Sequence, residues 1–184
     1  NIPSLVYLAP ATKEEYLSMI DWAIEQNEHP VAVRVPCGVV ISDGKEVKND
    51  WSDLNKYEIT KSGSKIAVIA LGAFYQLGEK AAELIKEKTG TAPTLINPHY
   101  ITGIDKDMLE SLKKNHDVVI TLEDGVLEGG FGEKIARFYG DSDIKTLCFG
   151  LDKKFYDRYD VNELMREAHL TPEQIAEDAT ALLK

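Results

Sequence analysis

The 184-residue sequence holds only two cysteines, Cys37 and Cys148, and neither has the CxxC or cysteine–histidine spacing of a metal site. Two cysteines alone do not indicate a disulfide framework, so we expect a reduced protein of the cytoplasm. The four histidines are scattered as well, and no two lie four residues apart, as they would on one face of a metal-binding helix. We therefore expect no metal site in this chain.

Long apolar runs and basic residues are also scarce. No apolar run approaches the roughly 20 residues that a membrane-spanning helix needs, and the first residues, Asn-Ile-Pro, lack the basic start of a signal peptide. The 21 lysines and arginines are outnumbered by 31 aspartates and glutamates, so the net charge is −10. Because nucleic acids and anionic membranes are polyanions, we expect neither as a partner. A small anionic substrate remains compatible, since an acidic protein can form a local basic pocket.

The sequence does contain a regular alternation of strand-like and helix-like segments. The strand-like segments are short and apolar throughout, which is typical of parallel strands buried on both faces. The alternation predicts an α/β fold in which helices cover both faces of a mostly parallel sheet. We expect strands at 4–10, 29–36, 65–71, 92–98, 117–123 and 144–150, and helices at 11–26, 74–90, 105–116, 129–140, 160–170 and 171–184.

The first of these helices begins with a capping signal, and a different kind of segment follows the second strand. Thr12 with Glu15 three residues later has the spacing of a capping box. Residues 37–64 are polar, are punctuated by glycine and lack helical periodicity. We interpret this stretch as a connector that can carry a short hairpin or an edge strand, and as the best candidate for a domain boundary.

A glycine-rich stretch separates the strand that ends near Glu123 from the next helix: Gly125, Gly129, Gly130 and Gly132. One interpretation is a phosphate-binding turn at a helix N-terminus. The spacing, however, is neither GxGxxG nor GxxxxGK[ST], and Lys134 is not placed as a phosphate-loop lysine. Glu123 and Asp124 would also repel a phosphate. We favour another interpretation, in which strand and helix pack closely and the backbone takes angles that cost little only for glycine. For the two acids we favour a role as a helix cap or at an interface.

Two residues are candidates for ligand binding, Arg34 and His99. Arg34 lies in the apolar strand "VAVRVP", two residues before its end, where an unpaired charge would be costly. Its guanidinium suits either a bound phosphate or carboxylate, or a structural salt bridge. His99 lies in "NPHYITG", in a loop after a strand, at the edge where open α/β sheets bind ligands. His116 falls near the end of a predicted helix, where it can complement the helix dipole.

The order of these segments resembles the carboxyl-terminal part of the 1-deoxy-D-xylulose-5-phosphate synthases of the transketolase family. "NIPSLVYLAPATKEEYLSMIDWAIEQNEHPVAVRVPCG" is similar to the end of their pyrimidine-binding domain. "KIAVIALGAFYQLGEKAAELI" resembles the first strand and helix of the transketolase C-terminal domain. "TLEDGVLEGGFGEKIARF" matches a signature of paired acids followed by G-G-x-G. "FGLDKKFYDRYDVNELMREAHLTPEQIAEDATALL" resembles the closing segment, so the likeness covers essentially the whole chain.

The resemblance implies a domain organisation and a role. It places the end of a pyrimidine-binding domain at 1–40, the connector at 41–64 and a transketolase C-terminal domain at 65–184. The parent enzyme would convert pyruvate and glyceraldehyde 3-phosphate to 1-deoxy-D-xylulose 5-phosphate and CO2, for isoprenoid and thiamine precursor synthesis. In this family the residues that bind thiamine diphosphate and magnesium lie upstream of these segments. We therefore expect this chain alone to bind no cofactor, to be inactive, and to serve domain packing and homodimer formation.

The same resemblance assigns a role to Arg34 and draws attention to departures from the family pattern. The family's arginine in A-V-R-x-P aligns with Arg34 and contacts the phosphate of glyceraldehyde 3-phosphate. The family usually has a second arginine at Cys37, arginine and lysine at His99 and Thr102, and His-Gly at Arg158 and the following tyrosine. Loss of these basic residues leaves the acceptor substrate open.

Two further interpretations stay open. A beta subunit of a 2-oxo acid dehydrogenase also carries G-G-F-G after paired acids. A stand-alone, non-catalytic dimerisation or regulatory module derived from this domain is the other alternative.

Overall fold

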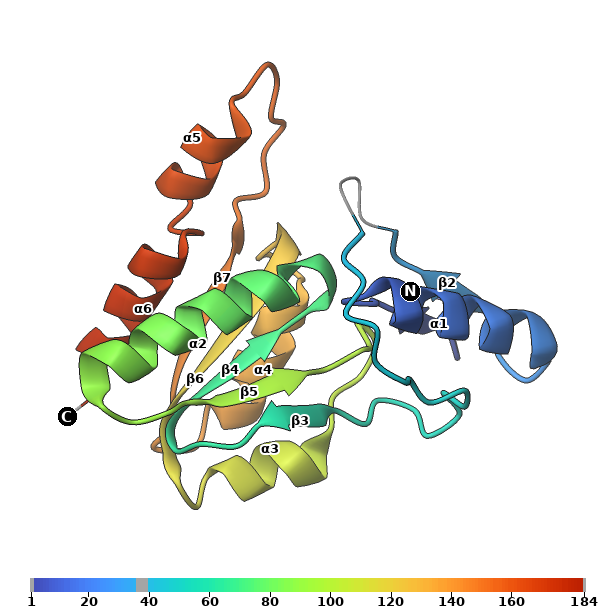
Figure 1. Ribbon diagram of the computed structural model, residues 1–184, viewed down its shortest axis with the longest axis horizontal. Coiled ribbons are helices and arrows are strands. Elements are labelled where there is room, and N and C mark those ends of the chain that lie inside the picture. The colour runs from blue at the N-terminus through green and yellow to red at the C-terminus, as the bar shows by residue number, and fades with distance from the viewer. Residues whose placement is uncertain (1, 36–39, 184) are drawn as a thin grey trace.

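A computed structural model describes residues 2–35 and 40–183, which form a five-stranded sheet covered by helices and a smaller unit beside it (Figure 1). The smaller unit contains a two-stranded sheet and the first helix. The strands are β1 (Val6–Leu8), β2 (Val31–Val33), β3 (Glu58–Lys61), β4 (Lys65–Ala70), β5 (Thr94–Asn97), β6 (His116–Val126) and β7 (Lys145–Leu151). The helices are α1 (Lys13–Glu25), the 3-10 turn η1 (Gly72–Phe74), α2 (Tyr75–Thr89), α3 (Lys106–Leu112), α4 (Phe131–Tyr139), α5 (Val161–Glu167) and α6 (Pro172–Ala181).

The large sheet has the strand order β3-β5-β4-β6-β7. Strands β4, β5, β6 and β7 pair in parallel, and β3 pairs antiparallel with β5 at one edge. The predicted α/β class with a mostly parallel sheet is therefore confirmed. The expected edge strand in the stretch 37–64 is β3, whereas the domain limits at 40 and 64 stay a prediction.

Side chains of the central strands alternate between two apolar cores, one on each face of the sheet, as the pleat requires. Ile66, Val68 and Ala70 of β4 face α2 and α6, while Ala67 and Ile69 face the other way. The second core is closed by α3 and α4 (Figure 1). Helices thus cover both faces, which explains why the strands are apolar along their whole length.

The smaller unit packs on the end of β5 through a third apolar cluster. Leu8 of β1 and Met19 of α1 are fully buried there with Trp51 and Tyr100. The Tyr100 hydroxyl donates to the Trp51 carbonyl oxygen at 2.8 Å, which fixes the irregular stretch after residue 40 against this cluster. The unit and the sheet therefore share buried contacts in the region where His99 lies.

Predicted boundaries differ from the structure by up to a few residues, and two of these differences have a clear physical cause. The helix predicted at 105–116 ends at Leu112, because a tight turn follows and His116 already pairs with Lys65 at the start of β6. Strand β6 runs on to Val126, beyond its predicted end at residue 123, because Val126 still pairs with Leu151 of β7. No helix among the described residues is long and apolar enough to cross a membrane.

His116 does complement a helix end, as predicted, but as a buried imidazole. Its Nδ1 lies 2.9 Å from the carbonyl oxygen of Leu112, and its Nε2 lies 2.8 Å from Thr94 Oγ1. A carbonyl accepts only, so Nδ1 carries the proton and Nε2 accepts from the threonine hydroxyl. The backbone N–H of Gly63 donates to the same hydroxyl oxygen at 3.1 Å. This arrangement suits the neutral form of the histidine, in which Nε2 is an acceptor.

We predict that the protein loses stability in mild acid through His116. Burial lowers the pKa of this imidazole from its ordinary value of 6.5, so the unfolded chain binds the proton more readily than the folded chain. The contribution of neutral His116 to the free energy of unfolding is then fully present above about pH 6.5. It falls as the pH drops through that value towards the folded pKa, by at most about 1.4 kcal/mol per pH unit for one proton. Urea unfolding of the protein and of His116→Gln between pH 5 and 8 checks this, since the variant should have a shallower slope. An equal slope in both proteins would contradict it.

Candidate functional site

Arg34 lies directly after β2, and its guanidinium reaches across to β6. Its Nη2 donates to the Asp124 carbonyl oxygen at 2.8 Å and lies 3.1 Å from Asp124 Oδ1. The two side chains are 29% and 24% exposed, and together they line a shallow hollow beside η1. Of the guanidinium nitrogens, only Nη2 donates a hydrogen bond within the described residues, and it goes to the Asp124 carbonyl oxygen. The guanidinium thus keeps donors for another acceptor. The salt-bridge interpretation of Arg34 is thus observed, and anion binding stays a prediction.

The glycine-rich turn before α4 has its own acceptor for the amides of the helix N-terminus. Phe131 N and Gly132 N donate to the two carboxylate oxygens of Glu123 at 2.9 and 2.8 Å. The two glycines before them donate within the same turn. A phosphate would have to displace a buried carboxylate, so the phosphate-binding interpretation is wrong for this turn. The cap role expected for Glu123 is confirmed.

The glycines of this turn are needed for conformation and for packing. Gly129 has φ of 73°, in the left-handed region that favours glycine. A Cβ on Gly132 would lie 2.5 Å from Thr121 Oγ1 and 3.0 Å from Cys148 Sγ. The close strand–helix packing that the sequence suggested is therefore what this turn provides.

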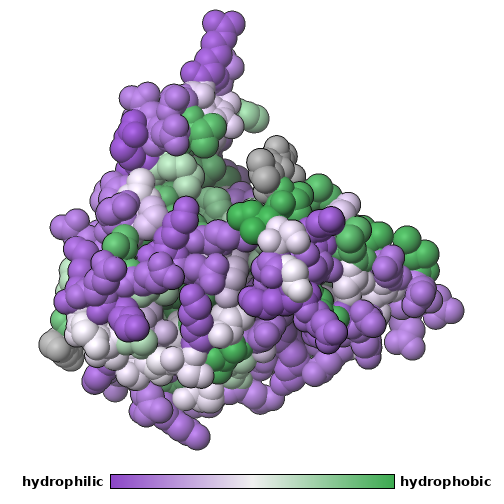
Figure 2. All heavy atoms as spheres, viewed as in Figure 1, coloured by the Kyte–Doolittle hydropathy of each residue, from purple (hydrophilic) through white to green (hydrophobic). Residues whose placement is uncertain are grey.

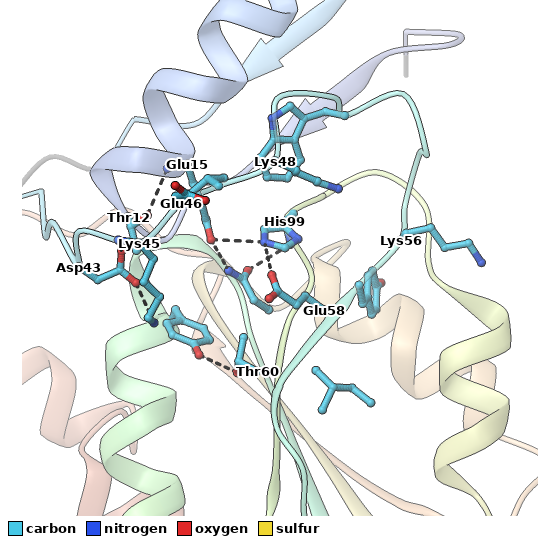
Figure 3. Close-up of a pocket in the computed structure, with 16 residues that line it drawn as sticks. Thr12, Glu15, Asp43, Lys45, Glu46, Lys48, Lys56, Glu58, Thr60 and His99 are labelled. Atoms are coloured by element: carbon cyan, nitrogen blue, oxygen red, sulfur yellow. Dashed lines mark hydrogen bonds and ion pairs between the residues drawn. The ribbon is translucent and has the colours of Figure 1, made fainter.

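His99 lines a different and larger feature, a cavity of about 510 Å³ between α1, the stretch 43–51, β3 and the end of β5 (Figure 3). Its side chain is 4% exposed, and its Nε2 lies 3.3 Å from Glu15 Oε1 and 3.6 Å from Glu58 Oε2. The ring meets Trp51 edge-on, with centroids 5.1 Å apart. Its Nδ1 is buried without a hydrogen-bond partner in the described part of the chain.

The backbone at His99 is strained, which is a feature of many functional sites. Its φ is 58°, a left-handed value that costs a residue with a Cβ some conformational energy. The conformation is held by the Ala9 N–H, which donates to the His99 carbonyl oxygen at 2.7 Å, and by Asn97 Oδ1, which accepts from His99 N at 3.3 Å. The smaller unit therefore fixes the histidine in place.

Glu15 connects the start of α1 to this cavity. As predicted, the Thr12 side chain accepts from Glu15 N, at 3.2 Å. The carboxylate of Glu15 also accepts from Ala11 N at 2.7 Å and from Asn97 Nδ2 at 2.9 Å (Figure 3). This buried carboxylate is thus supplied with neutral donors besides its contact with His99, so its burial is compensated.

A lysine lies on the opposite wall of the cavity. Lys48 Nζ is 4.2 Å from the centroid of the Trp51 ring, a cation–π distance. Burial lowers the pKa of Lys48, while the fields of Asp53 and Glu58 act in the opposite direction. The cavity therefore combines the ammonium group of an exposed lysine with carboxylates and a histidine.

The structure does not bring Arg34 and His99 into one cavity, because they line separate hollows. Of the positions that depart from the family pattern, Thr102 accepts from Tyr7 N at 3.1 Å and so joins β1 to the end of β5. Arg158 lies in the loop before α5 with φ of 51°, and Cys37 lies outside the described residues. In the described ranges 2–35 and 40–183, no group of three or more side chains is arranged to hold a metal.

The comparisons with known proteins agree with this architecture. Residues 55–175 match the family described as "Transketolase, C-terminal domain", well over half of the chain. The chain belongs to this family, and the expected domain type is confirmed.

The more specific likeness is to one enzyme of this class. The chain is 34% identical over 177 residues to the 1-deoxy-D-xylulose-5-phosphate synthase of Clostridium botulinum (strain Alaska E43 / Type E3), which covers 95% of this chain and 28% of that relative. It is 29% identical over 189 residues to the synthase of Shouchella clausii (strain KSM-K16), covering 100% of this chain and 29% of that relative. The predicted likeness to these synthases is confirmed, and the chain spans less than a third of their length.

Solved structures of similar shape are transketolases. A structure titled "Split gene transketolase, inactive beta4 tetramer" has a TM-score of 0.79 at 19% identity, covering 100% of this chain and 60% of that chain. A transketolase mutant from Pichia stipitis has a TM-score of 0.69 at 14% identity, covering 98% of this chain and 25% of that one. At these identities the likeness concerns the fold.

Proposed function

We propose that this chain is the carboxyl-terminal part of a thiamine-diphosphate-dependent synthase of the cytoplasm that makes 1-deoxy-D-xylulose 5-phosphate and CO2 from pyruvate and glyceraldehyde 3-phosphate. The observation that carries the proposal is the 34% identity to such a synthase over 95% of the chain. The match runs from the smaller unit through the C-terminal domain. This favours a synthase over an enzyme that shares only the transketolase C-terminal domain.

The described residues contain no side-chain group arranged for a metal. When bound in the parent enzyme, thiamine diphosphate supplies the electron sink for decarboxylation. We propose that the parts of the enzyme outside this chain hold it and that this chain alone is inactive. The beta4 tetramer of a split-gene transketolase of similar fold is described as inactive, which supports the second point.

In this proposal Arg34 binds the phosphate of the acceptor aldose. Asp124 and its carbonyl oxygen orient the guanidinium through Nη2, and its remaining donors match the oxygens of a phosphate. Arg34 lies at the carboxyl end of β2, and its side chain is 29% exposed. The residue can therefore be pre-oriented by its salt bridge and still take an anion.

The smaller unit serves domain packing in this proposal. A two-stranded sheet is marginal by itself, and in Figure 2 apolar side chains gather on the surface of this part of the molecule. Exposed apolar residues of this unit and of the stretch after it are Leu17, Ile24, Val35 and Ile41. A second exposed apolar group, Phe155, Tyr159 and Val161, precedes and begins α5 and offers a surface for a homodimer.

We predict that the intact protein, isolated from its source through a tag on this chain, forms 1-deoxy-D-xylulose 5-phosphate from pyruvate and glyceraldehyde 3-phosphate. The measurement is CO2 release and product formation with and without added thiamine diphosphate and magnesium. The same preparation gives the polypeptide masses and the oligomeric state.

Different outcomes separate the alternatives. Activity with a polypeptide about three times as long as this chain supports the proposal, in line with the relatives' length. Oxidative decarboxylation without a sugar product would instead identify a 2-oxo acid dehydrogenase subunit. A short polypeptide without activity or a partner chain would identify a non-catalytic module.

A further inference from the structure

The cavity at His99 has the features of a built binding site. Its volume of about 510 Å³ is in the range of small-molecule pockets. Three polar residues on its wall, Glu15, Asn97 and His99, are more than nine-tenths buried. Burying polar side chains costs free energy unless they are hydrogen-bonded, and these three are joined in one network by the contacts described above. The function proposed above assigns no role to these three residues.

The charges on the wall separate into those that are already paired and those that are free. Lys45 lies 2.9 Å from Asp43, and Lys56 lies 3.1 Å from Asp107. Lys48, in contrast, has no ion pair in the part of the chain that the structure describes. The cavity therefore offers an available ammonium group, placed over the Trp51 ring.

Two exposed glutamates of the wall, Glu46 and Glu58, have no ion pair with a lysine or arginine in the part of the chain that the structure describes. Glu15 is already supplied by two neutral donors. Glu58 is 62% exposed, and its one close polar contact among the described residues is His99 Nε2 at 3.6 Å. Figure 3 shows Glu58 beside His99, with Lys48 on the far side of the histidine ring. A ligand with an anionic group alone would meet the repulsion of Glu58 and Glu15, and one with a cationic group alone would meet that of Lys48.

We propose that this cavity binds a small zwitterion, whose anionic group pairs with Lys48 and whose ammonium group pairs with Glu58 beside His99. Such a ligand pairs with Lys48 and Glu58 at once, and each contact is a charge-assisted hydrogen bond. Amino acids with a short carbon chain have this chemistry and fit the volume.

Calorimetric titration of the intact protein that carries this chain tests the inference. The probe is β-alanine, and its single-charge counterparts are propionate and ethylamine. We expect a dissociation constant of about 1 mM or lower for β-alanine, and binding at least about tenfold weaker for each counterpart, because each lacks one charged contact. Binding is measured without turnover, so the result is independent of the proposed function.

Two conservative variants locate the binding. Lys48→Met keeps the apolar stem over Trp51 but removes the charge, and Glu58→Gln keeps the shape of an exposed strand residue. Each should weaken β-alanine binding at least about tenfold. Lys65→Met is the matched control, because Lys65 is an exposed, ion-paired lysine that lies outside the cavity, and it should leave the affinity unchanged.

Two results would overturn the inference. One is the absence of saturable binding of β-alanine by the intact protein, for instance because another part of the protein fills the cavity. The other is binding that persists unchanged in Lys48→Met, which would place the probe elsewhere.

Discussion

Replacing Glu123 with alanine should lower the free energy of unfolding by about 3 kcal/mol, because two amides lose their acceptor. The carboxylate is buried and accepts from Phe131 N and Gly132 N at the first turn of α4. Alanine leaves both amides without this partner, and each buried orphan costs about 1–3 kcal/mol. The substitution also removes a negative charge from the positive end of the helix dipole.

Urea unfolding at neutral pH checks this expectation, with two variants for comparison. Glu123→Gln keeps one acceptor oxygen and should lose clearly less stability than Glu123→Ala. Glu133→Ala is the matched control, because Glu133 accepts from Gly129 N in the same turn but is exposed. It should cost less than about 1 kcal/mol. Equal losses at the buried and the exposed glutamate would refute the role given to Glu123.

The fold could be predicted from the sequence because its signals are local. The apolar runs at 65–71 and 144–150, with helical spacing between strands, were enough for a parallel sheet covered on both faces. The boundaries that were wrong depend on distant pairing. Strand β6 extends to Val126 because β7 offers Leu151 as a partner, and no local signal near Val126 indicates that.

The candidate site shows the opposite case, since its contacts join residues far apart in the chain. Glu15 and Asn97 are separated by 82 positions, and Arg34 and Asp124 by 90. The sequence identified Glu15 through its capping box, which accounts for its position at the start of α1. The capping box does not indicate that Glu15 lines a cavity. Lys48 and Glu58 lie in a stretch that we interpreted as a connector able to carry an edge strand, with no binding role, because polar segments of this kind carry no periodic signal.

Replacing Arg34 with alanine in the intact enzyme should raise the KM for glyceraldehyde 3-phosphate by about 100-fold and leave the KM for pyruvate nearly unchanged. The expected size follows from the loss of a charged, bidentate contact to phosphate, about 3 kcal/mol. Arg34→Lys keeps the charge but loses the planar geometry, so its KM should fall between those of the wild type and the alanine variant.

Asp124→Asn separates phosphate binding from a structural role. The substitution keeps the backbone carbonyl that accepts from Nη2 at 2.8 Å, but removes the carboxylate charge 3.1 Å from the guanidinium. If Arg34 binds phosphate, this variant should raise the KM for the acceptor less than Arg34→Ala does, because the guanidinium stays near its place without its ion pair. If the salt bridge is the whole role of Arg34, both variants should lower stability alike and change the two KM values together. Steady-state kinetics with each substrate varied in turn, alongside urea unfolding of each variant, decide between these roles.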